Sequence, residues 1–72
     1  MNNLARLYKT LYPGGTRIEL ISMKDEYSPI NPGTKGTVVF VDCAGNIHMK
    51  WDDGRTLAII PTTDRFKKIG KT

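Results

Sequence analysis

Few residues in this 72-residue chain are of types that carry out chemistry, and they do not combine into a known catalytic set. His48 is the only histidine and Cys43 the only cysteine. A Ser/His/Asp triad, a Cys/His pair and a metal site with several histidine or cysteine ligands are therefore unsupported. His48 alternates with apolar neighbours, which predicts a solvated or hydrogen-bonded histidine on the outer face of a strand. Cys43 follows an acidic residue, which disfavours the reactive thiolate, so we interpret it as an unreactive turn cysteine.

Carboxylates and glycines offer two further kinds of site. Asp52 and Asp53 are adjacent, and Asp42 is expected on the neighbouring strand; such groups can bind a cation or transfer protons. Asp53-Gly54 is also ordinary hairpin-turn chemistry, and the later glutamate of a calcium loop is missing. Residues 33–37, Gly-Thr-Lys-Gly-Thr, lack the spacing of a phosphate-binding loop. We therefore predict no catalytic residue, no metal, no cofactor and no enzymatic activity.

A binding role is the better prediction, and one long loop is its best candidate. Residues 24–33 contain two prolines and a charged beginning, and loops carry function more often than the elements they connect. Tyr27, Pro29 and Ile30 of this loop, together with Trp51, form the predicted partner groove. The alternative is that these residues only close the end of the fold. Trp51 and Phe40 are also predicted to pack in the core, because so small a domain needs large side chains there.

The net charge of +4 is unevenly distributed along the chain. Residues 1–15 carry two basic residues and residues 65–72 carry four, whereas residues 16–64 hold five basic against seven acidic residues. The basic character therefore lies in the termini. Six residues are candidate phosphate contacts: Lys35, Lys50, Arg55, Arg65, Lys67 and Lys68. Asp52 and Asp53 close to some of them argue against a continuous basic face, and a solvated basic tail is the alternative.

The elements that must position these residues can be read from the hydrophobic period. Leu4, Leu7, Tyr8 and Leu11 repeat at helical spacing, which predicts an amphipathic helix over residues 1–12 that ends at Pro13. So short a helix is marginal alone and must pack on the rest of the domain or on a partner.

From residue 16 the period changes to two. Strands are predicted from Thr16, over 37–41, 47–51, 56–60 and 65–69, with tight turns at 44–46 and 53–54 and a single 3₁₀ turn at 61–64. Five short strands and one long loop indicate a mainly β fold, a small five-stranded antiparallel SH3-like barrel over residues 13–69 with a basic tail at 70–72. An OB-fold is the runner-up, although it usually needs a longer chain and an inserted helix.

The segment from Tyr12 to Phe66 resembles a family of small domains of unknown function met in Gram-positive bacteria and their mobile elements. The matching residues are Arg17–Met23, Pro32–Val38, Val41, Asp42, Gly45, Ile47, His48, Trp51, Asp52, Gly54, Leu57, Ile60 and Pro61. The resemblance implies no activity and no assigned site residues. Residues 32–38 also look like the turn of KOW-type modules, a short likeness.

Together these observations predict a single domain, with a protein-binding adaptor as its first function. The alternative is a nucleic-acid-binding module that uses the basic termini and is linked to a mobile element. An uncovered strand edge would allow a homodimer as well as a monomer. We expect a cytoplasmic protein without a membrane partner, because the start lacks the apolar run of a secretory signal and small secreted domains usually contain disulfides.

Overall fold

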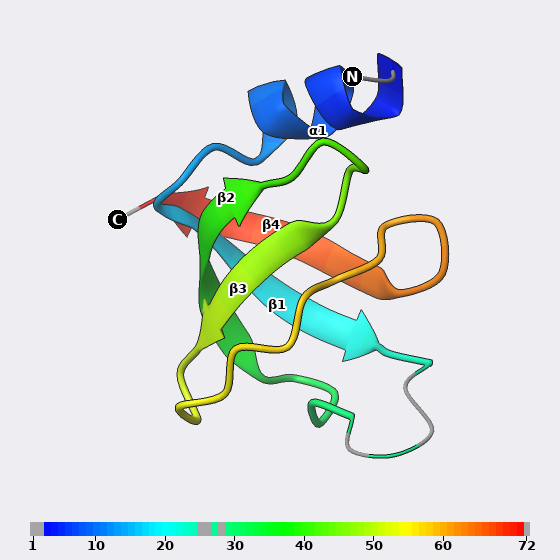
Figure 1. Ribbon diagram of the computed structural model, residues 1–72. Helices are drawn as coiled ribbons and strands as arrows, with labels where there is room; N and C mark the ends of the chain where they lie inside the picture. The colour runs from blue at the N-terminus through cyan, green and yellow to red at the C-terminus, as the bar shows by residue number, and fades with distance from the viewer. Residues whose placement is uncertain (1–2, 25–26, 28, 72) are drawn as a thin grey trace.

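The computed structural model describes residues 3–24, 27 and 29–71 of the chain. In this part of the chain a helix, α1 (Asn3–Leu11), is followed by four strands: β1 (Thr16–Ser22), β2 (Lys35–Val41), β3 (Ile47–Trp51) and β4 (Arg65–Lys71). The strands form one antiparallel sheet in the order β3-β2-β1-β4, and α1 lies across one end of it (Figure 1). No helix in the described residues is long and apolar enough to cross a membrane.

Alternation of apolar and polar residues explains why one face of the sheet is buried. Ile18 and Leu20 of β1 meet Met49 and Trp51 of β3 in a core that also includes residues from the loops. Gly36 of β2 lies beneath the indole of Trp51, where a Cβ atom would come within 2.8 Å of Cε3. This close approach explains the need for glycine in the strand that crosses the middle of the core.

The prediction that Phe40 packs in the core is wrong. The register of β2 against β3 shifts between Val38 and Phe40, so Val39 and Phe40 both face outward, and Phe40 is 51% exposed. A bulge inserts one extra residue and reverses the side chains that follow it. Val41 is buried as a result.

The prediction of a five-stranded closed barrel differs from the observed open sheet of four strands. Residues 56–60, predicted as a strand, make only an isolated bridge, in which Ile59 pairs with Ile47. Two backbone groups of this segment are bonded by side chains instead. The indole Nε1 of Trp51 donates to the Leu57 carbonyl at 2.8 Å, and Asp64 Oδ2 accepts from the Ile60 amide at 2.9 Å. The segment therefore follows β3 without forming a regular ladder.

The predicted turns and the predicted helix are present. Gly45 and Gly54 adopt φ values of 91° and 93°, which glycine reaches without strain, and each lies in a tight turn flanking β3. The 61–64 turn is also present, with the Thr63 and Asp64 amides both donating to the Ile60 carbonyl. β4 continues to Lys71, through part of the predicted 70–72 tail; Thr72 lies outside the described residues.

Candidate partner-binding hollow

The four residues of the predicted groove do not lie together on the surface. Ile30 and Trp51 are each only 1% exposed and belong to the core. Tyr27 is 94% exposed and Pro29 is also on the surface. Ile30 is the anchor by which the long loop packs on the sheet, and residues 25, 26 and 28 of that loop lie outside the described residues.

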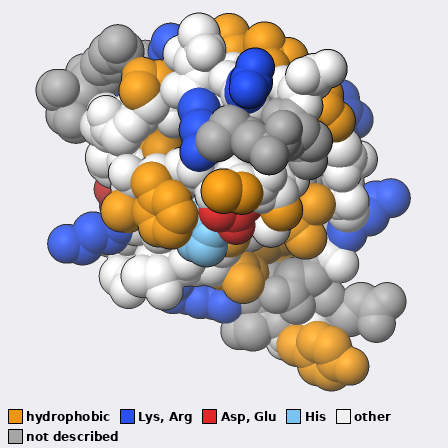
Figure 2. Space-filling view, turned by 45° about the horizontal axis from the view of Figure 1, so that its top comes forward, with side chains coloured by type: hydrophobic (Ala, Val, Ile, Leu, Met, Phe, Trp, Pro, Cys, Tyr) orange, Lys and Arg blue, Asp and Glu red, His pale blue; other side chains and the backbone are white. Residues whose placement is uncertain are grey.

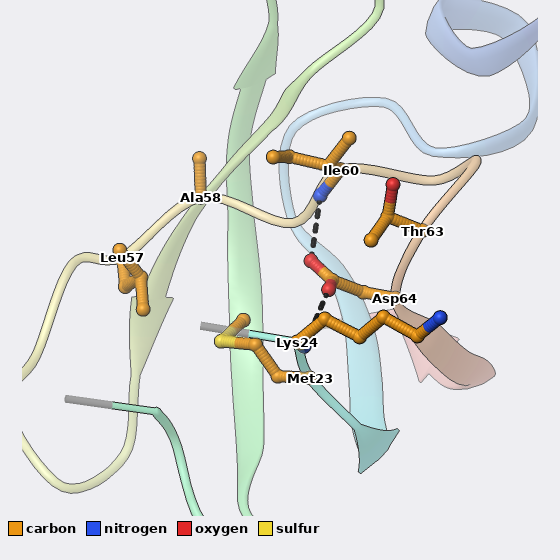
Figure 3. Close-up of a pocket in the computed structure, with 7 residues that line it drawn as sticks. All are labelled: Met23, Lys24, Leu57, Ala58, Ile60, Thr63 and Asp64. Atoms are coloured by element: carbon orange, nitrogen blue, oxygen red, sulfur yellow. Dashed lines mark hydrogen bonds between the residues drawn. The ribbon is translucent and has the colours of Figure 1, made fainter. Parts of the chain in front are cut away.

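A hollow with mostly apolar walls opens where the long loop begins. It has a volume of about 170 Å³ and opens to solvent. Met23 and Lys24, which directly follow β1, form one wall, and Leu57, Ala58 and Ile60 form the opposite wall (Figure 3). Thr63 and Asp64, from the turn before β4, complete the lining.

Asp64 holds the two walls at a fixed separation. Its carboxylate accepts from the Lys24 amide at 3.0 Å and from the Ile60 amide at 2.9 Å, and the residue is only 7% exposed (Figure 3). A carboxylate that bonds two backbone amides from segments far apart in sequence acts as a clamp. The 61–64 turn places the Asp64 side chain, because the backbone amide of Asp64 donates to the Ile60 carbonyl at 2.8 Å.

The second wall is fixed from the core side. Trp51 Nε1 bonds the Leu57 carbonyl, and Ile59 exchanges both backbone hydrogen bonds with Ile47. In the described part of the chain, every buried side-chain polar atom has a hydrogen-bond partner. The hollow thus offers apolar surface on a rigid frame and suits an apolar group rather than an ionic one.

A second, wider depression lies along the 55–58 segment and is lined partly by His48 and Arg55. His48 Nε2 lies 2.8 Å from Asp42 Oδ2, and its ring stacks on Phe40 with centroids 4.3 Å apart and planes within 4°. The predicted hydrogen-bonded strand histidine is therefore confirmed. Arg55 Nη1 donates to the Pro29 carbonyl at 2.9 Å and ties the long loop to this segment.

Asp42 has an altered acidity because of these contacts. The hydrogen bond from His48, followed by the backbone amides of Asn46 and Ala44, lowers the pKa of Asp42 to about 2. The same carboxylate closes the β2–β3 turn through the two amides. Its role is therefore accounted for by the turn and by the histidine that it orients, and Cys43 beside it is exposed.

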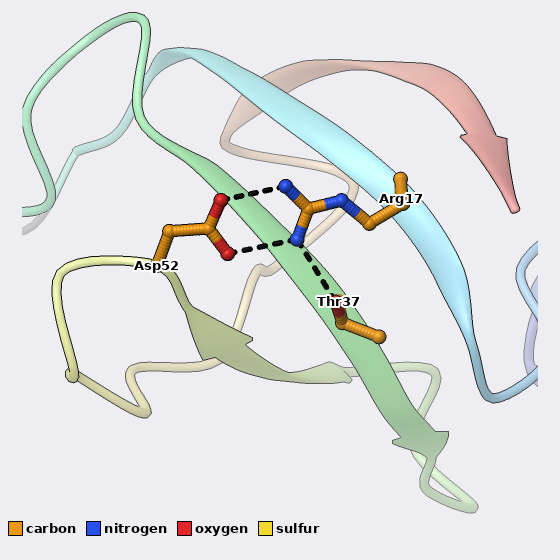
Figure 4. A network of polar contacts seen from close by, with 3 residues as sticks. All are labelled: Arg17, Thr37 and Asp52. Carbon is orange, nitrogen blue, oxygen red and sulfur yellow. Dashed lines mark hydrogen bonds and ion pairs between the residues drawn. The ribbon is translucent and has the colours of Figure 1, made fainter. Parts of the chain in front are cut away.

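Arg17 and Asp52 form an ion pair across the outer face of the sheet (Figure 4). The two guanidinium nitrogens of Arg17 lie 2.8 and 2.6 Å from the two carboxylate oxygens, and Nη1 also donates to the Thr37 hydroxyl. The hydrogen bonds from Arg17, assisted by its charge and that of Lys35, lower the pKa of Asp52. Asp52 was considered above as a group that could bind a cation or transfer a proton. In the structure its carboxylate is bound to Arg17 and joins β1 to the end of β3.

The six candidate phosphate contacts fall into separate groups. Lys35 pairs with Glu19 across the sheet, and Glu19 pairs on its other side with Lys67, so charges of opposite sign alternate along this row. Such pairs of opposite charge stabilise a sheet and reduce the positive electrostatic potential at its surface. Lys50 lies on β3, Arg55 contacts the long loop, and Arg65 and Lys68 lie on β4 at the opposite edge. Within the described residues no cluster of three His, Cys, Asp or Glu side chains could hold a metal ion.

Sequence reasoning missed most of the hollow. Met23, Leu57 and Ala58 carry no local signal, since their role depends on contacts with distant segments. Asp64 carried a signal: an acidic residue closing a turn of the type Pro-Thr-Thr-Asp, which favours side-chain bonding to nearby amides.

Comparison with known proteins gives a family but no function. Neither the curated proteins nor the solved structures contain a match to this chain. The family of domains of unknown function DUF4314 matches residues 1–69, nearly the whole length. The chain therefore belongs to the DUF4314 family.

Proposed function

We propose that this protein is a non-catalytic adaptor module that binds a protein partner by receiving an apolar side chain in the hollow between Met23 and Ala58. The observation that carries this proposal is the apolar hollow itself, which is braced on both sides by hydrogen bonds from Asp64 and Trp51. A cavity of roughly 150 Å³ with apolar walls accommodates a group the size of benzene. The hollow therefore suits one large aliphatic or aromatic side chain.

The surroundings of the hollow support a peptide as the ligand. Ile60 at its rim is 48% exposed, and Tyr27 of the adjoining loop is 94% exposed. Exposed apolar side chains beside a preformed pocket are typical of interfaces in which one anchor enters a pocket and flanking contacts exclude water. Tyr27 and Pro29 remain our candidates for such flanking contacts, whereas Ile30 and Trp51 support them from the core.

We further propose that the fold is an open variant of the SH3-like barrel. The order β4-β1-β2-β3, with the segment around Ile59 beyond β3, is the order in which the five strands of such a barrel neighbour one another. The family resemblance and the single cysteine support a cytoplasmic role in Gram-positive bacteria or their mobile elements. Nucleic-acid binding is the weaker alternative, because the candidate phosphate contacts are divided among β2, β3, β4 and the 55–58 segment.

Selection from a displayed library of random peptides tests the proposal. We expect enriched peptides to share a large apolar residue and to lose at least about tenfold in affinity for Ala58→Phe, whose ring would fill the hollow. Met23→Ala, which enlarges it, should shift the preference toward a larger apolar residue. The matched control is Lys50→Ala on the outer sheet face, which should leave affinity unchanged.

The proposal fails if the enriched peptides bind Ala58→Phe as well as they bind the unchanged protein. It also fails if selection enriches only acidic peptides whose affinity falls steeply with salt, since that pattern reports charge and not an apolar pocket.

A further inference from the structure

The backbone that follows β3 runs beside that strand in a constant register, although it forms no regular ladder. The Trp51 amide donates to the Arg55 carbonyl at 2.8 Å, and Ile47 and Ile59 exchange two backbone hydrogen bonds at 2.9 and 2.8 Å. Both contacts belong to one antiparallel register, since each step forward from Arg55 to Ile59 matches a step back from Trp51 to Ile47. Residues 55–59 are therefore extended, with one edge turned toward β3.

The backbone groups of Ala58 are directed away from β3. In an extended chain that pairs with a neighbour, alternate residues direct their amide and carbonyl groups toward that neighbour and the intervening residues direct them away. Arg55 and Ile59 bond to β3, so Ala58 belongs to the other set. Within the described residues, neither the amide nor the carbonyl of Ala58 has a hydrogen-bond partner. Ala58 therefore offers a donor and an acceptor on the open edge of this segment.

The open edge is short, because the residues that follow Ala58 close it. At Ile60 the amide donates to the Asp64 carboxylate at 2.9 Å, and the carbonyl accepts from amides of the following turn. Pro61 comes next and has no amide hydrogen to donate. Thr56, two residues before Ala58, faces the same edge and is exposed. We call residues 56–58 the open edge.

The open edge borders the apolar hollow. Ala58 and Leu57 line the hollow, and both also line the second depression, so the two depressions are reached from the same stretch of backbone. Proteins that recognise an extended peptide at a sheet edge combine the same two features. Backbone hydrogen bonds supply affinity there, and pockets for alternate side chains supply specificity.

The exposed leucines at the other end of the molecule lack this combination. Leu4, Leu7 and Leu11 form an exposed strip on α1, the leucine strip. Figure 2 looks toward this end and shows hydrophobic side chains interspersed with Lys and Arg side chains. The backbone groups in the middle of a helix bond to one another, so this strip offers none to a partner.

We propose that the ligand of the hollow is an extended peptide segment, which lies along the open edge as a further strand and exchanges hydrogen bonds with the amide and carbonyl of Ala58. One apolar side chain of the segment enters the hollow. The inference rests on the proposed function and specifies how the same site holds its ligand. A helical ligand would bond its own backbone and leave Ala58 without partners. A flexible segment suits so short an edge better than the rigid strand of a second folded copy.

Single ester replacements in a bound peptide test this pairing. The probe is a synthetic peptide enriched by the selection described above, remade with one backbone amide at a time replaced by an ester, which removes a donor and keeps every side chain. We expect the ester that removes the donor to the Ala58 carbonyl to weaken binding by about tenfold. The esters on either side of it should weaken binding by less than about threefold, because their donors face away from Ala58. Isothermal titration calorimetry measures each affinity.

Amide hydrogen exchange of the full chain reports the protein side of the same contact. Saturating peptide should slow exchange at the Ala58 amide by at least about tenfold, because that amide gains a hydrogen bond. The Ile60 amide is the matched control, since Asp64 bonds it without the peptide. Its exchange should change by less than about threefold.

The outcomes separate this inference from the proposed function. Peptides that lose affinity for Ala58→Phe, yet tolerate every single ester and leave exchange at Ala58 unchanged, would overturn the extended pairing and leave the proposed function standing. A selection that enriches no peptide, or only peptides that bind Ala58→Phe unimpaired, would overturn both. Slowing of exchange at Ala58 with rising protein concentration and no peptide would assign the open edge to a second copy and overturn the inference.

Discussion

Asp42 and His48 form the contact whose ionisation most clearly distinguishes the folded chain from the unfolded one. The pKa of Asp42 is lowered to about 2 by the hydrogen bond from His48 and by the turn amides. A carboxyl whose folded pKa lies below its unfolded value stabilises the fold above that unfolded value, near 4. This stabilisation is lost as pH falls from about 4 toward 2.

Asp42→Asn tests this assignment. We expect the variant to be less stable than the unchanged protein at pH 7 and the difference to shrink as pH falls toward 2, where Asp42 becomes half protonated in the folded protein. Urea unfolding followed by circular dichroism across this range gives the two stability curves. A difference that is as large at pH 2 as at pH 7 would show that the charge of Asp42 contributes nothing.

Trp51→Phe tests the bond that braces residues 56–60 beside β3. The change removes the indole N–H that bonds the Leu57 carbonyl while keeping an aromatic ring in the core. A lost bond at a part-buried site, together with the smaller ring, should lower the free energy of unfolding by about 1–3 kcal/mol. Amide hydrogen exchange at Ile59 should quicken more than at Ile18. Equal changes at both positions would contradict the bracing role of Trp51.

At the scale of elements, α1 depends on one small residue for its position. Ala5 is fully buried, and a Cβ atom on Gly45 of the β2–β3 turn would lie 3.7 Å from the Ala5 backbone. Ala5→Leu therefore overfills this contact and should cost about 1–3 kcal/mol of unfolding free energy. Leu4→Ala, on the exposed strip, should change it by less than about 0.5 kcal/mol. Urea unfolding compares the two; a larger loss in Leu4→Ala would mean that the leucine strip is packed.

The elements that sequence predicts well are those set by local chemistry. Gly45 and Asp53-Gly54 mark their turns because only a few residues tolerate positive φ. Strands β1 and β3 are predicted by the alternation of apolar and polar residues. The bulge that exposes Phe40 has no such signature, since one extra residue in β2 matters only through its register with β3. In residues 56–60, side-chain bonds from Trp51 and Asp64, six and four residues away, take the place of a regular ladder, and apolar alternation alone does not reveal them.

Over the whole molecule, the hollow and helix α1 lie at different ends of one sheet. The hollow lies where β1 leaves the sheet and the 57–64 segment returns to it, and α1 lies across the other end. The outer face between them carries alternating charges and the Arg17–Asp52 pair. The location of the long loop was predictable, whereas the hollow was not, because distant segments create its walls.

The central claim is that the hollow is the site where a protein partner binds. Its most direct test is a methyl NMR titration of the full chain with a peptide enriched by selection. We predict saturable shifts at Met23, Leu57, Ala58 and Ile60, with little change at Leu4 and Leu7. Shifts confined to the α1 leucines, or to none of these methyl groups, would contradict the claim.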